Sequence, residues 1–472
     1  MRLYYRIAPS VLFFFALFLS SISCVSFAST SKSNSTTTEA SSTNAFSVLA
    51  RQAVLGFRIN QGDDQTVRIV HVEANSPAHQ AGLRAGDRIH QINQHSFHYA
   101  YQAQALLKKL QGGQTLQLQL SRGEDSPPHE IQFTPKPRPQ EHIPGVISHY
   151  RSVQLSPQIK LRAIITQAEH QQGPRPALLF TQWVSCSSIE YQPGSNGLDI
   201  LAALARHSGY ALIRVERSSD GDSQGPACHE LDYNSELDHY VQAYRQLLQD
   251  PLIAQAPVVI YGASLGSTTA PLLAQRLQEQ GIEVAGVAIQ GGGAYTHLER
   301  MIHFDRIYLE RRADAKPHTI HQEMAQRIRF HHEYLIKQRQ PDDIARDNPA
   351  MAQVRHHVFG LGQGQHYGRP YAWHQQAAQH NVLAAWLALQ GRALVIFNEY
   401  EQFEMRHGHQ IIARTLNAQR PGSARYVEQT GLGHSNNRYA SIADAYLWRN
   451  GEGQAQQTAK VILDWLANEI AD

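Results

Sequence analysis

Hydrophobic and polar residues alternate in two different ways along the chain, and the change comes near residue 140. Between residues 48 and 135 apolar residues occupy every second position in short runs, which predicts strands buried on one face. These runs are VLGFRI, VRIVHVE, DRIHQIN, TLQLQLSR and HEIQFTP. The stretch AYQAQALLKKL has helical spacing instead. We therefore expect a small β-rich domain with one helix over residues 48–135.

After residue 150 the apolar runs are continuous, and helical patterns separate most of them. The runs are KLRAIITQ, ALLFTQWV, ALIRVERS, PVVIYGAS, VAGVAIQGG, RALVIFNEY and ARYVEQTG. Such strands alternating with helices are typical of a parallel sheet that is covered on both faces. The expected fold class is therefore α/β, with a mostly parallel sheet over residues 150–472. The interval of about 294–390 is mainly helical in pattern and too long for a simple crossover, which predicts an inserted cap.

The first 28 residues have the pattern of a secretory signal peptide. MRLYYR supplies positive charge, Val11 to Leu19 is a short apolar core, and Ser26 to Ala28 is a cleavage site of small residues. This pattern predicts export to the periplasm or the medium. An uncleaved membrane anchor is one alternative. Lipid attachment at Cys24 is another, which Ser21 disfavours because an aliphatic residue usually stands there.

Composition refines this picture in three ways. The 472 residues are 42% hydrophobic and 17% charged, an ordinary globular composition, and the net charge of +2 gives no basic field for nucleic acid. Residues 29–47 are rich in Ser and Thr, which predicts a disordered linker, and residues 136–149 form a second, Pro-rich linker. Without Cys24 the chain keeps Cys186 and Cys228, which suggests a disulfide in an exported protein; two buried thiols are the alternative.

Three stretches of residues 48–135 resemble a PDZ domain. They are Leu55 to Phe57, which read LGF, the turn AGLRAGDRI, and INQHSF after it. The resemblance implies that backbone N–H groups of Leu55, Gly56 and Phe57 bind the C-terminal carboxylate of a peptide, which adds as a strand. A module that packs between domains and captures no peptide is the alternative.

A serine between two glycines follows the apolar run PVVIYGAS. In the motif Gly262-Ala263-Ser264-Leu265-Gly266 a buried strand turns sharply into a helical pattern. Such a turn strains the central residue and exposes its hydroxyl, and the glycines remove side chains that would collide. The motif in this context resembles the α/β-hydrolase family over residues 150–472. The resemblance implies that Ser264 is a nucleophile.

The same resemblance implies an acid and then a histidine later in the chain. His434 lies in GLGHSNN after the last predicted strand, and it is the expected base. Glu401 is the expected acid, with Glu399 as the alternative, because Asn398 stands where the family usually has glycine. His407, His409 and the pairs His331/His332 and His356/His357 are rivals by composition only, since none follows a late strand.

The resemblance also implies an oxyanion hole made of backbone amides. One is the N–H of Leu265, and the other belongs to Gln182 or Trp183 in the loop after ALLFTQWV. Cys186 follows in this loop and Cys228 lies in the loop after the next strand, so a disulfide between them would lie at the mouth of the site.

No cofactor is expected, because the chain has neither an H-E-x-x-H motif nor a Cys/His quartet. DGDSQGPACHEL resembles a calcium loop, but its twelfth position is Leu231, so a polar turn is the better interpretation. The sequence predicts an exported serine hydrolase of carboxylic esters or related acyl bonds, with a PDZ domain that recruits a peptide or protein. A serine peptidase and an inactive binding protein are the alternatives. Turnover of small esters is expected not to need residues 48–135.

Overall fold

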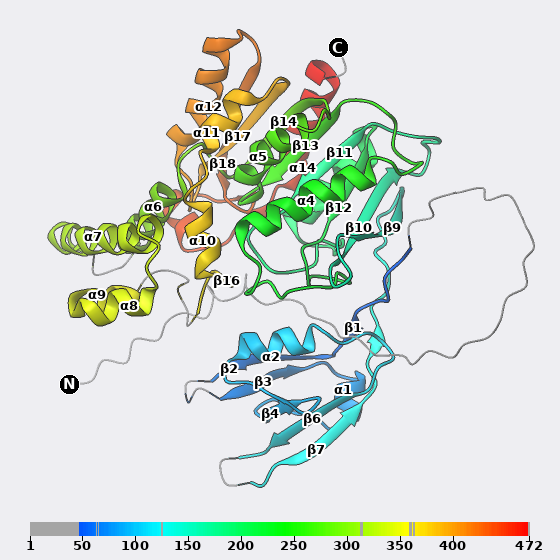
Figure 1. Ribbon diagram of the computed structural model, residues 1–472, viewed down its shortest axis with the longest axis vertical. Coiled ribbons are helices and arrows are strands. Elements are labelled where there is room, and N and C mark those ends of the chain that lie inside the picture. The colour runs from blue at the N-terminus through cyan, green and yellow to red at the C-terminus, as the bar shows by residue number, and fades with distance from the viewer. Residues whose placement is uncertain are drawn as a thin grey trace, which may run out of the picture.

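The computed structural model describes residues 47–470 except 63, 65, 124, 125, 312–314, 358–360, 362 and 363. The expected signal peptide, Cys24 and nearly all of the Ser/Thr-rich segment lie outside the described residues. Figure 1 shows two parts, a small sheet with one prominent helix and a larger sheet between helices. None of the helices described is both long enough and apolar enough to span a bilayer.

The small part is a twisted antiparallel sheet with helix α2 packed on it. Its sheet has the order β2-β3-β4-β6-β7, and β5 pairs with β4. The elements are β1 (Ala53–Val54), β2 (Phe57–Gln61), β3 (Val67–Val72), α1 (Pro77–Gln80), β4 (Arg88–Ile92), β5 (His95–Ser96), α2 (Ala100–Leu107), β6 (Leu116–Ser121) and β7 (His129–Phe133). Leu116, Leu118 and Leu120 share one buried face with Ala103 and Leu107 of α2, as the alternation of period two predicts.

The large part is a ten-stranded sheet of order β20-β19-β18-β17-β14-β13-β11-β12-β10-β9. Its strands are β9 (Val146–Gln154), β10 (Lys160–Ala168), β11 (Ala177–Thr181), β12 (Ala211–Val215), β13 (Val258–Ala263), β14 (Val284–Gln290), β17 (Arg392–Tyr400), β18 (Ala424–Gly433), β19 (Asn437–Arg438) and β20 (Glu452–Gly453). The six central strands, β12 to β18 along the sheet, run parallel, and β10 is antiparallel to β12. The expected α/β fold class is confirmed.

Helices cover both faces of this sheet because its strands are apolar on both sides. Leu179 of β11 packs in the core under one set of helices, while Leu178 and Phe180 pack under the other. The first set is α4 (Tyr233–Leu247), α5 (Gly266–Gln278), α11 (Val382–Ala388) and α12 (Arg406–Gln419), and the second is α3 (Asn196–His207) and α14 (Ala455–Trp465). Two short elements, α13 (Ile442–Tyr446) and η3 (Leu466–Ile470), follow β18.

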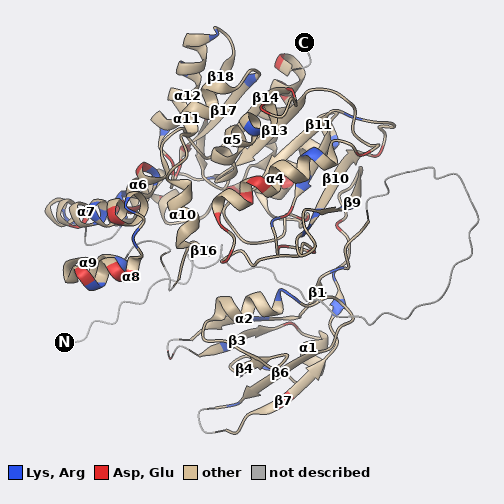
Figure 2. Ribbon diagram, in the orientation of Figure 1, with Lys and Arg blue, Asp and Glu red and all other residues tan. Residues whose placement is uncertain are grey.

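A helical insertion lies between β14 and β17. It comprises α6 (His297–Glu310), α7 (Pro317–His331), η2 (His332–Ile336), α8 (Pro341–Asp347), α9 (Pro349–His357), β15 (Gln365–His366), β16 (Arg369–Pro370) and α10 (Tyr371–Ala377). Phe330, Tyr334 and Ile344 belong to a small separate core within it. Trp386 of α11 instead packs in the main core, so the end of the interval belongs to the sheet domain. Figure 2 shows acidic and basic residues mixed along α7 to α9.

The segment expected as a Pro-rich linker carries strands at both of its ends. β8 (Lys136–Pro137) pairs with β1, and β9 already begins at Val146 and pairs with β10 along its whole length. The sequence VISHYRSVQ did not predict β9, because its polar residues interrupt the apolar pattern. An edge strand tolerates such a composition, since its outer edge has no neighbouring strand.

Candidate active site

Ser264 occupies a sharp turn between β13 and α5 in the middle of the large sheet. Its backbone has a φ of 54°, in the left-handed region that a residue with a side chain rarely adopts. A Cβ on Gly262 would collide with the carbonyl of Gly266, and a Cβ on Gly266 would collide with the carbonyl of Thr181. The two glycines therefore permit the close packing of α5 on β11 that holds Ser264 in this conformation.

Ser264, His434 and Glu401 form a hydrogen-bonded chain. The Oγ atom of Ser264 lies 2.8 Å from Nε2 of His434. Nδ1 of His434 lies 2.6 Å from Oε1 of Glu401. Ser264 follows β13, Glu401 follows β17 and His434 follows β18, so three strand ends bring together residues 170 positions apart in sequence. When Nδ1 of His434 carries the proton and donates a hydrogen bond to Glu401, Nε2 is unprotonated and can accept a hydrogen bond from the hydroxyl of Ser264.

The two carboxylates considered from the sequence have different partners. Glu401 is 4% exposed, and its Oε1 also accepts a hydrogen bond from the backbone N–H of Phe403 at 3.0 Å. Glu399 instead accepts from the backbone N–H of Gly431, at 2.8 Å, and does not contact the imidazole among the hydrogen bonds of the described residues. Glu399 thus holds β18, while Glu401 orients His434.

Burial and charge shift the pKa values of Glu401 and His434 in opposite directions. Burial favours neutral Glu401, but the adjacent imidazole and its hydrogen bond outweigh burial, and the pKa of Glu401 is lowered. Burial likewise disfavours the charged form of His434, but the carboxylate of Glu401 outweighs it, and the pKa of His434 is raised above 6.5. The geometry therefore stabilises an imidazolium beside a carboxylate, which is the charge state that a proton transfer from Ser264 would create.

Three amide side chains that the sequence did not identify hold the loop of His434. Oε1 of Gln402 accepts from the backbone N–H of His434 at 2.6 Å, and Nε2 of Gln290 donates to its carbonyl at 3.2 Å. Nδ2 of Asn398 donates to the carbonyl of Gly433 at 2.7 Å. Gln290 ends an otherwise apolar strand, and Asn398 stands where the resemblance led us to expect glycine, so both left a signal in the sequence, whereas Gln402 left none.

The segments expected to supply oxyanion amides lie next to each other. Leu265 begins the first turn of α5, and Gly266 in that turn packs against the end of β11, where Gln182 and Trp183 follow. The ring of Trp183 packs edge-to-face on Phe180 with ring centres 5.7 Å apart, so this side chain points into the core. The carbonyl of Gln182 accepts from Arg217 at 3.2 Å.

Aromatic side chains flank the imidazole. The ring of Phe403 meets the ring of His434 edge-on at 4.8 Å, and Phe304 of α6 meets Phe403 at 5.6 Å. Trp448 lies on another side of Phe403 at 6.0 Å. Phe304 of the insertion and Phe403, which follows Glu401, therefore place aromatic rings on one side of the imidazole.

A disulfide joins Cys186 and Cys228, with Cα atoms 5.9 Å apart. Cys186 is in the loop after β11 and Cys228 is in the loop after β12, so the bridge links the expected oxyanion loop to its neighbour. Two of the rival histidines have other hydrogen-bond partners: His407 bonds the hydroxyl of Tyr295, and His409, although it is near enough to Glu401 to interact with its charge, bonds the carbonyl of Met405. The described residues contain no cluster of three side chains suited to a metal ion.

Comparison with known proteins identifies the small part. Residues 53–132 match the family described as the PDZ domain. They form a PDZ domain. In it Leu55 and Phe57 are buried and Gly56 has a φ of 72°, where a Cβ would collide with Ser76. The loop that precedes β2 of the PDZ domain therefore requires glycine at position 56.

The rest of the chain has the α/β-hydrolase fold, with a serine at a strand-to-helix turn of a mainly parallel sheet. No curated protein matches the chain. Among solved structures it is similar to the Pyrococcus furiosus esterase Pf2001, with 9% identity, 69% of this chain and 91% of that chain covered, and a TM-score of 0.39. It is also similar to Est1E from Butyrivibrio proteoclasticus, with 10% identity, 68% of this chain and 99% of that chain covered, and a TM-score of 0.42.

Proposed function

We propose that the protein is a serine hydrolase that cleaves carboxylic esters through Ser264, His434 and Glu401. The observation that carries this proposal is the hydrogen-bonded chain of these three side chains on a strained turn. These three side chains combine a nucleophile, a base whose Nε2 lies 2.8 Å from the nucleophile's Oγ, and a carboxylate that fixes the tautomer of the base. No cofactor takes part in this chemistry.

In the first half-reaction, Oγ of Ser264 attacks the ester carbonyl carbon while Nε2 of His434 takes the hydroxyl proton. The tetrahedral oxyanion accepts hydrogen bonds from the backbone N–H of Leu265 and from that of Gln182 or Trp183. When this intermediate collapses, the C–O bond to the alcohol breaks, and His434 returns the proton to the leaving oxygen. The products are an acyl-enzyme and an alcohol.

In the second half-reaction, His434 takes a proton from water, and the resulting hydroxide attacks the acyl carbon. The bond to Ser264 breaks, its oxygen regains the proton from His434, and a carboxylic acid leaves. Glu401 stays ionised throughout and stabilises the imidazolium in each half-reaction. This role is consistent with the lowered pKa of Glu401 and the raised pKa of His434.

The protein acts after export, on a substrate or partner that the PDZ domain helps to recruit. The disulfide between Cys186 and Cys228 is consistent with an oxidising compartment. The PDZ domain would bind a peptide C-terminus at Leu55, Gly56 and Phe57, with the peptide added along β2. This domain also favours a second candidate function, cleavage of a peptide by the same three residues.

A substrate panel tests the proposal and separates the two functions. Purified protein is assayed with p-nitrophenyl esters of increasing acyl length and with fluorogenic peptides, and Ser264→Ala is the control. We expect ester turnover that Ser264→Ala lowers by several orders of magnitude. Turnover of peptides alone would favour the peptidase, and no turnover of either by folded protein would indicate an inactive binding protein.

A further inference from the structure

The loop after β11 presents its backbone carbonyls to cationic side chains. Arg217 donates to the carbonyls of Gln182 and Ser185, at 3.2 and 3.0 Å. Arg369 donates to the carbonyl of Val184 at 3.3 Å. In a trans peptide the N–H of the next residue points opposite to the carbonyl. Cations that fix these carbonyls therefore also fix the direction of the amides in the expected oxyanion loop.

The fourth such carbonyl, that of Cys186, is held by the PDZ domain. Nζ of Lys108, at the end of α2, donates to it at 2.7 Å and forms an ion pair at 2.6 Å with Asp220. Lys108 is 9% exposed and Asp220 is fully buried. At the other end of α2, the ring of Tyr101 meets the ring of His229 at 4.9 Å, beside the second disulfide residue. Helix α2 thus contacts both loops that the disulfide joins.

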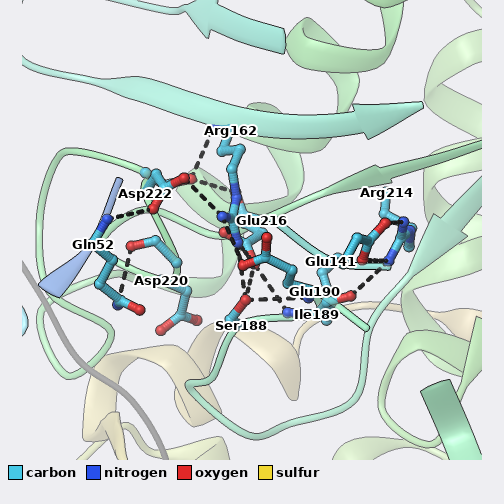
Figure 3. Close-up of polar contacts among 12 residues, drawn as sticks. Gln52, Glu141, Arg162, Ser188, Ile189, Glu190, Arg214, Glu216, Asp220 and Asp222 are labelled. Atoms are coloured by element: carbon cyan, nitrogen blue, oxygen red, sulfur yellow. Dashed lines mark hydrogen bonds and ion pairs between the residues drawn. The ribbon is translucent and has the colours of Figure 1, made fainter. Parts of the chain in front are cut away.

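A second cluster of charges fixes the PDZ domain on the turn after β12. Arg51 pairs with Asp222 and, at 2.6 Å, with Glu190, while the backbone N–H of Gln52 donates to Asp222 at 2.9 Å. Figure 3 shows Gln52 reaching Asp222, which also pairs with the buried Arg162. The polar turn that resembled a calcium loop is therefore the docking surface for residues 51, 52 and 108.

We propose that Lys108 is a positioning residue for the oxyanion loop, so that the PDZ domain supports turnover even of substrates too small to reach it. This inference rests on the proposed function. It predicts the opposite of the sequence-based expectation that small-ester turnover does not need residues 48–135. Lys108 does not touch the reacting atoms; it acts through the carbonyl of Cys186, four residues after Gln182.

Charge-matched variants separate an effect on the position of the oxyanion loop from an effect on the stability of the fold. Lys108→Met alone leaves Asp220 as a buried carboxylate without its cation, which destabilises the fold and should lower the melting temperature. The double variant Lys108→Met/Asp220→Asn removes both charges, so it avoids that cost but still releases the carbonyl of Cys186. Lys109→Met is the matched control, because the side chain of Lys109 makes no hydrogen bond or ion pair with the residues that the structure describes.

The experiment measures kcat, KM and melting temperature on a p-nitrophenyl ester with the full-length protein. We expect kcat of the double variant to fall roughly 10- to 100-fold while KM changes little, because misplaced oxyanion donors weaken binding of the transition state alone. The pH at which its activity falls on the acid side should not move, because His434 and Glu401 keep their contact. Lys109→Met should match the wild type.

Wild-type kcat in a double variant that melts at the wild-type temperature would overturn the inference and leave the proposed function intact. The inference would also be overturned if Lys108→Met lowers both kcat and the melting temperature and the added Asp220→Asn restores both to wild-type values, because the loss of kcat would then come from the loss of stability. Absence of ester turnover in the wild type would overturn the proposed function and the inference together.

Discussion

At the scale of single residues, the proposed chemistry depends on a few contacts at the ends of three strands. The motif around Ser264 and the late position of His434 were visible in the sequence, because a strained turn requires glycines at fixed spacing. The sequence left the acid open, because Glu399 and Glu401 both follow the same strand. The structure resolves this choice: the register of β17 and β18 shifts between Asn398 and Tyr400, Glu399 contacts the backbone of Gly431, and Glu401 contacts His434.

Replacing the two carboxylates in turn tests this assignment. Glu401→Gln keeps the shape of the side chain but removes the charge that stabilises the imidazolium, so kcat should fall roughly 10²- to 10⁴-fold. Because Glu401 raises the pKa of His434, the acid limb of kcat/KM should lie above pH 6.5 in the wild type and move to lower pH in the variant. Glu399→Gln is the control, and it should change kcat and the pH of the acid limb much less. Reversed effects would make Glu399 the acid.

At the scale of elements, the alternating and continuous apolar runs predicted most strands of both sheets, because burial on one or two faces leaves a distinct pattern. β9 escaped prediction, since its polar residues suit an edge. The helical insertion was expected from its length, but its internal packing was not. A chain of buried histidines runs through it: Nε2 of His297 lies 2.9 Å from Nδ1 of His374, whose Nε2 lies 2.7 Å from the carbonyl of His366.

This chain should make the stability of the insertion sensitive to acid. Nδ1 of His374 must stay unprotonated to accept from His297, and burial lowers the pKa of both residues well below 6.5. Neighbouring groups lower these two pKa values further: the cations Arg300 and Arg369, and the imidazoles of His331 and His366 when they are protonated. The unfolded chain then binds more protons below pH 6.5, so the free energy of unfolding falls as pH is lowered, by up to about 1.4 kcal/mol per pH unit for each histidine.

Melting temperatures between pH 7.5 and pH 5.5 measure this effect. The wild type should lose stability over that range, and His374→Gln should lose less, because one of the titrating groups is gone. His318→Gln, at an exposed position of α7, should behave as the wild type does. Equal pH dependence in the wild type and His374→Gln would show that the buried histidines do not titrate on unfolding.

At the scale of the whole molecule, the PDZ domain, the insertion and the sheet all meet at one loop beside Ser264. The sequence predicted two domains but not their contact, because the pair of Lys108 and Asp220 joins residues 112 positions apart. Charged residues in a polar turn usually indicate a solvated surface, and only the docked domain shows that these are buried. The disulfide holds the same loop at Cys186, the residue whose carbonyl accepts the hydrogen bond from Lys108.

Removing this disulfide should destabilise the domain that contains the large sheet. The bridge closes a loop with a sequence separation of 42, which corresponds to a stabilisation of about 4 kcal/mol from the lost entropy of the unfolded chain. Cys186→Ser/Cys228→Ser should therefore melt at a lower temperature than the oxidised wild type and at the same temperature as the reduced wild type. Thiols that label fully in native protein made in an oxidising compartment would contradict this account.

The central claim is that Ser264 is a nucleophile activated by His434 and Glu401. The most direct measurement is intact mass spectrometry and peptide mapping after brief exposure of the folded protein to a fluorophosphonate, whose phosphorus bonds to an activated serine oxygen as fluoride leaves. The account predicts one adduct, located on Ser264, that is absent from Ser264→Ala and forms more slowly in Glu401→Gln. An unlabelled wild type, or an adduct that Ser264→Ala retains in full, would contradict it.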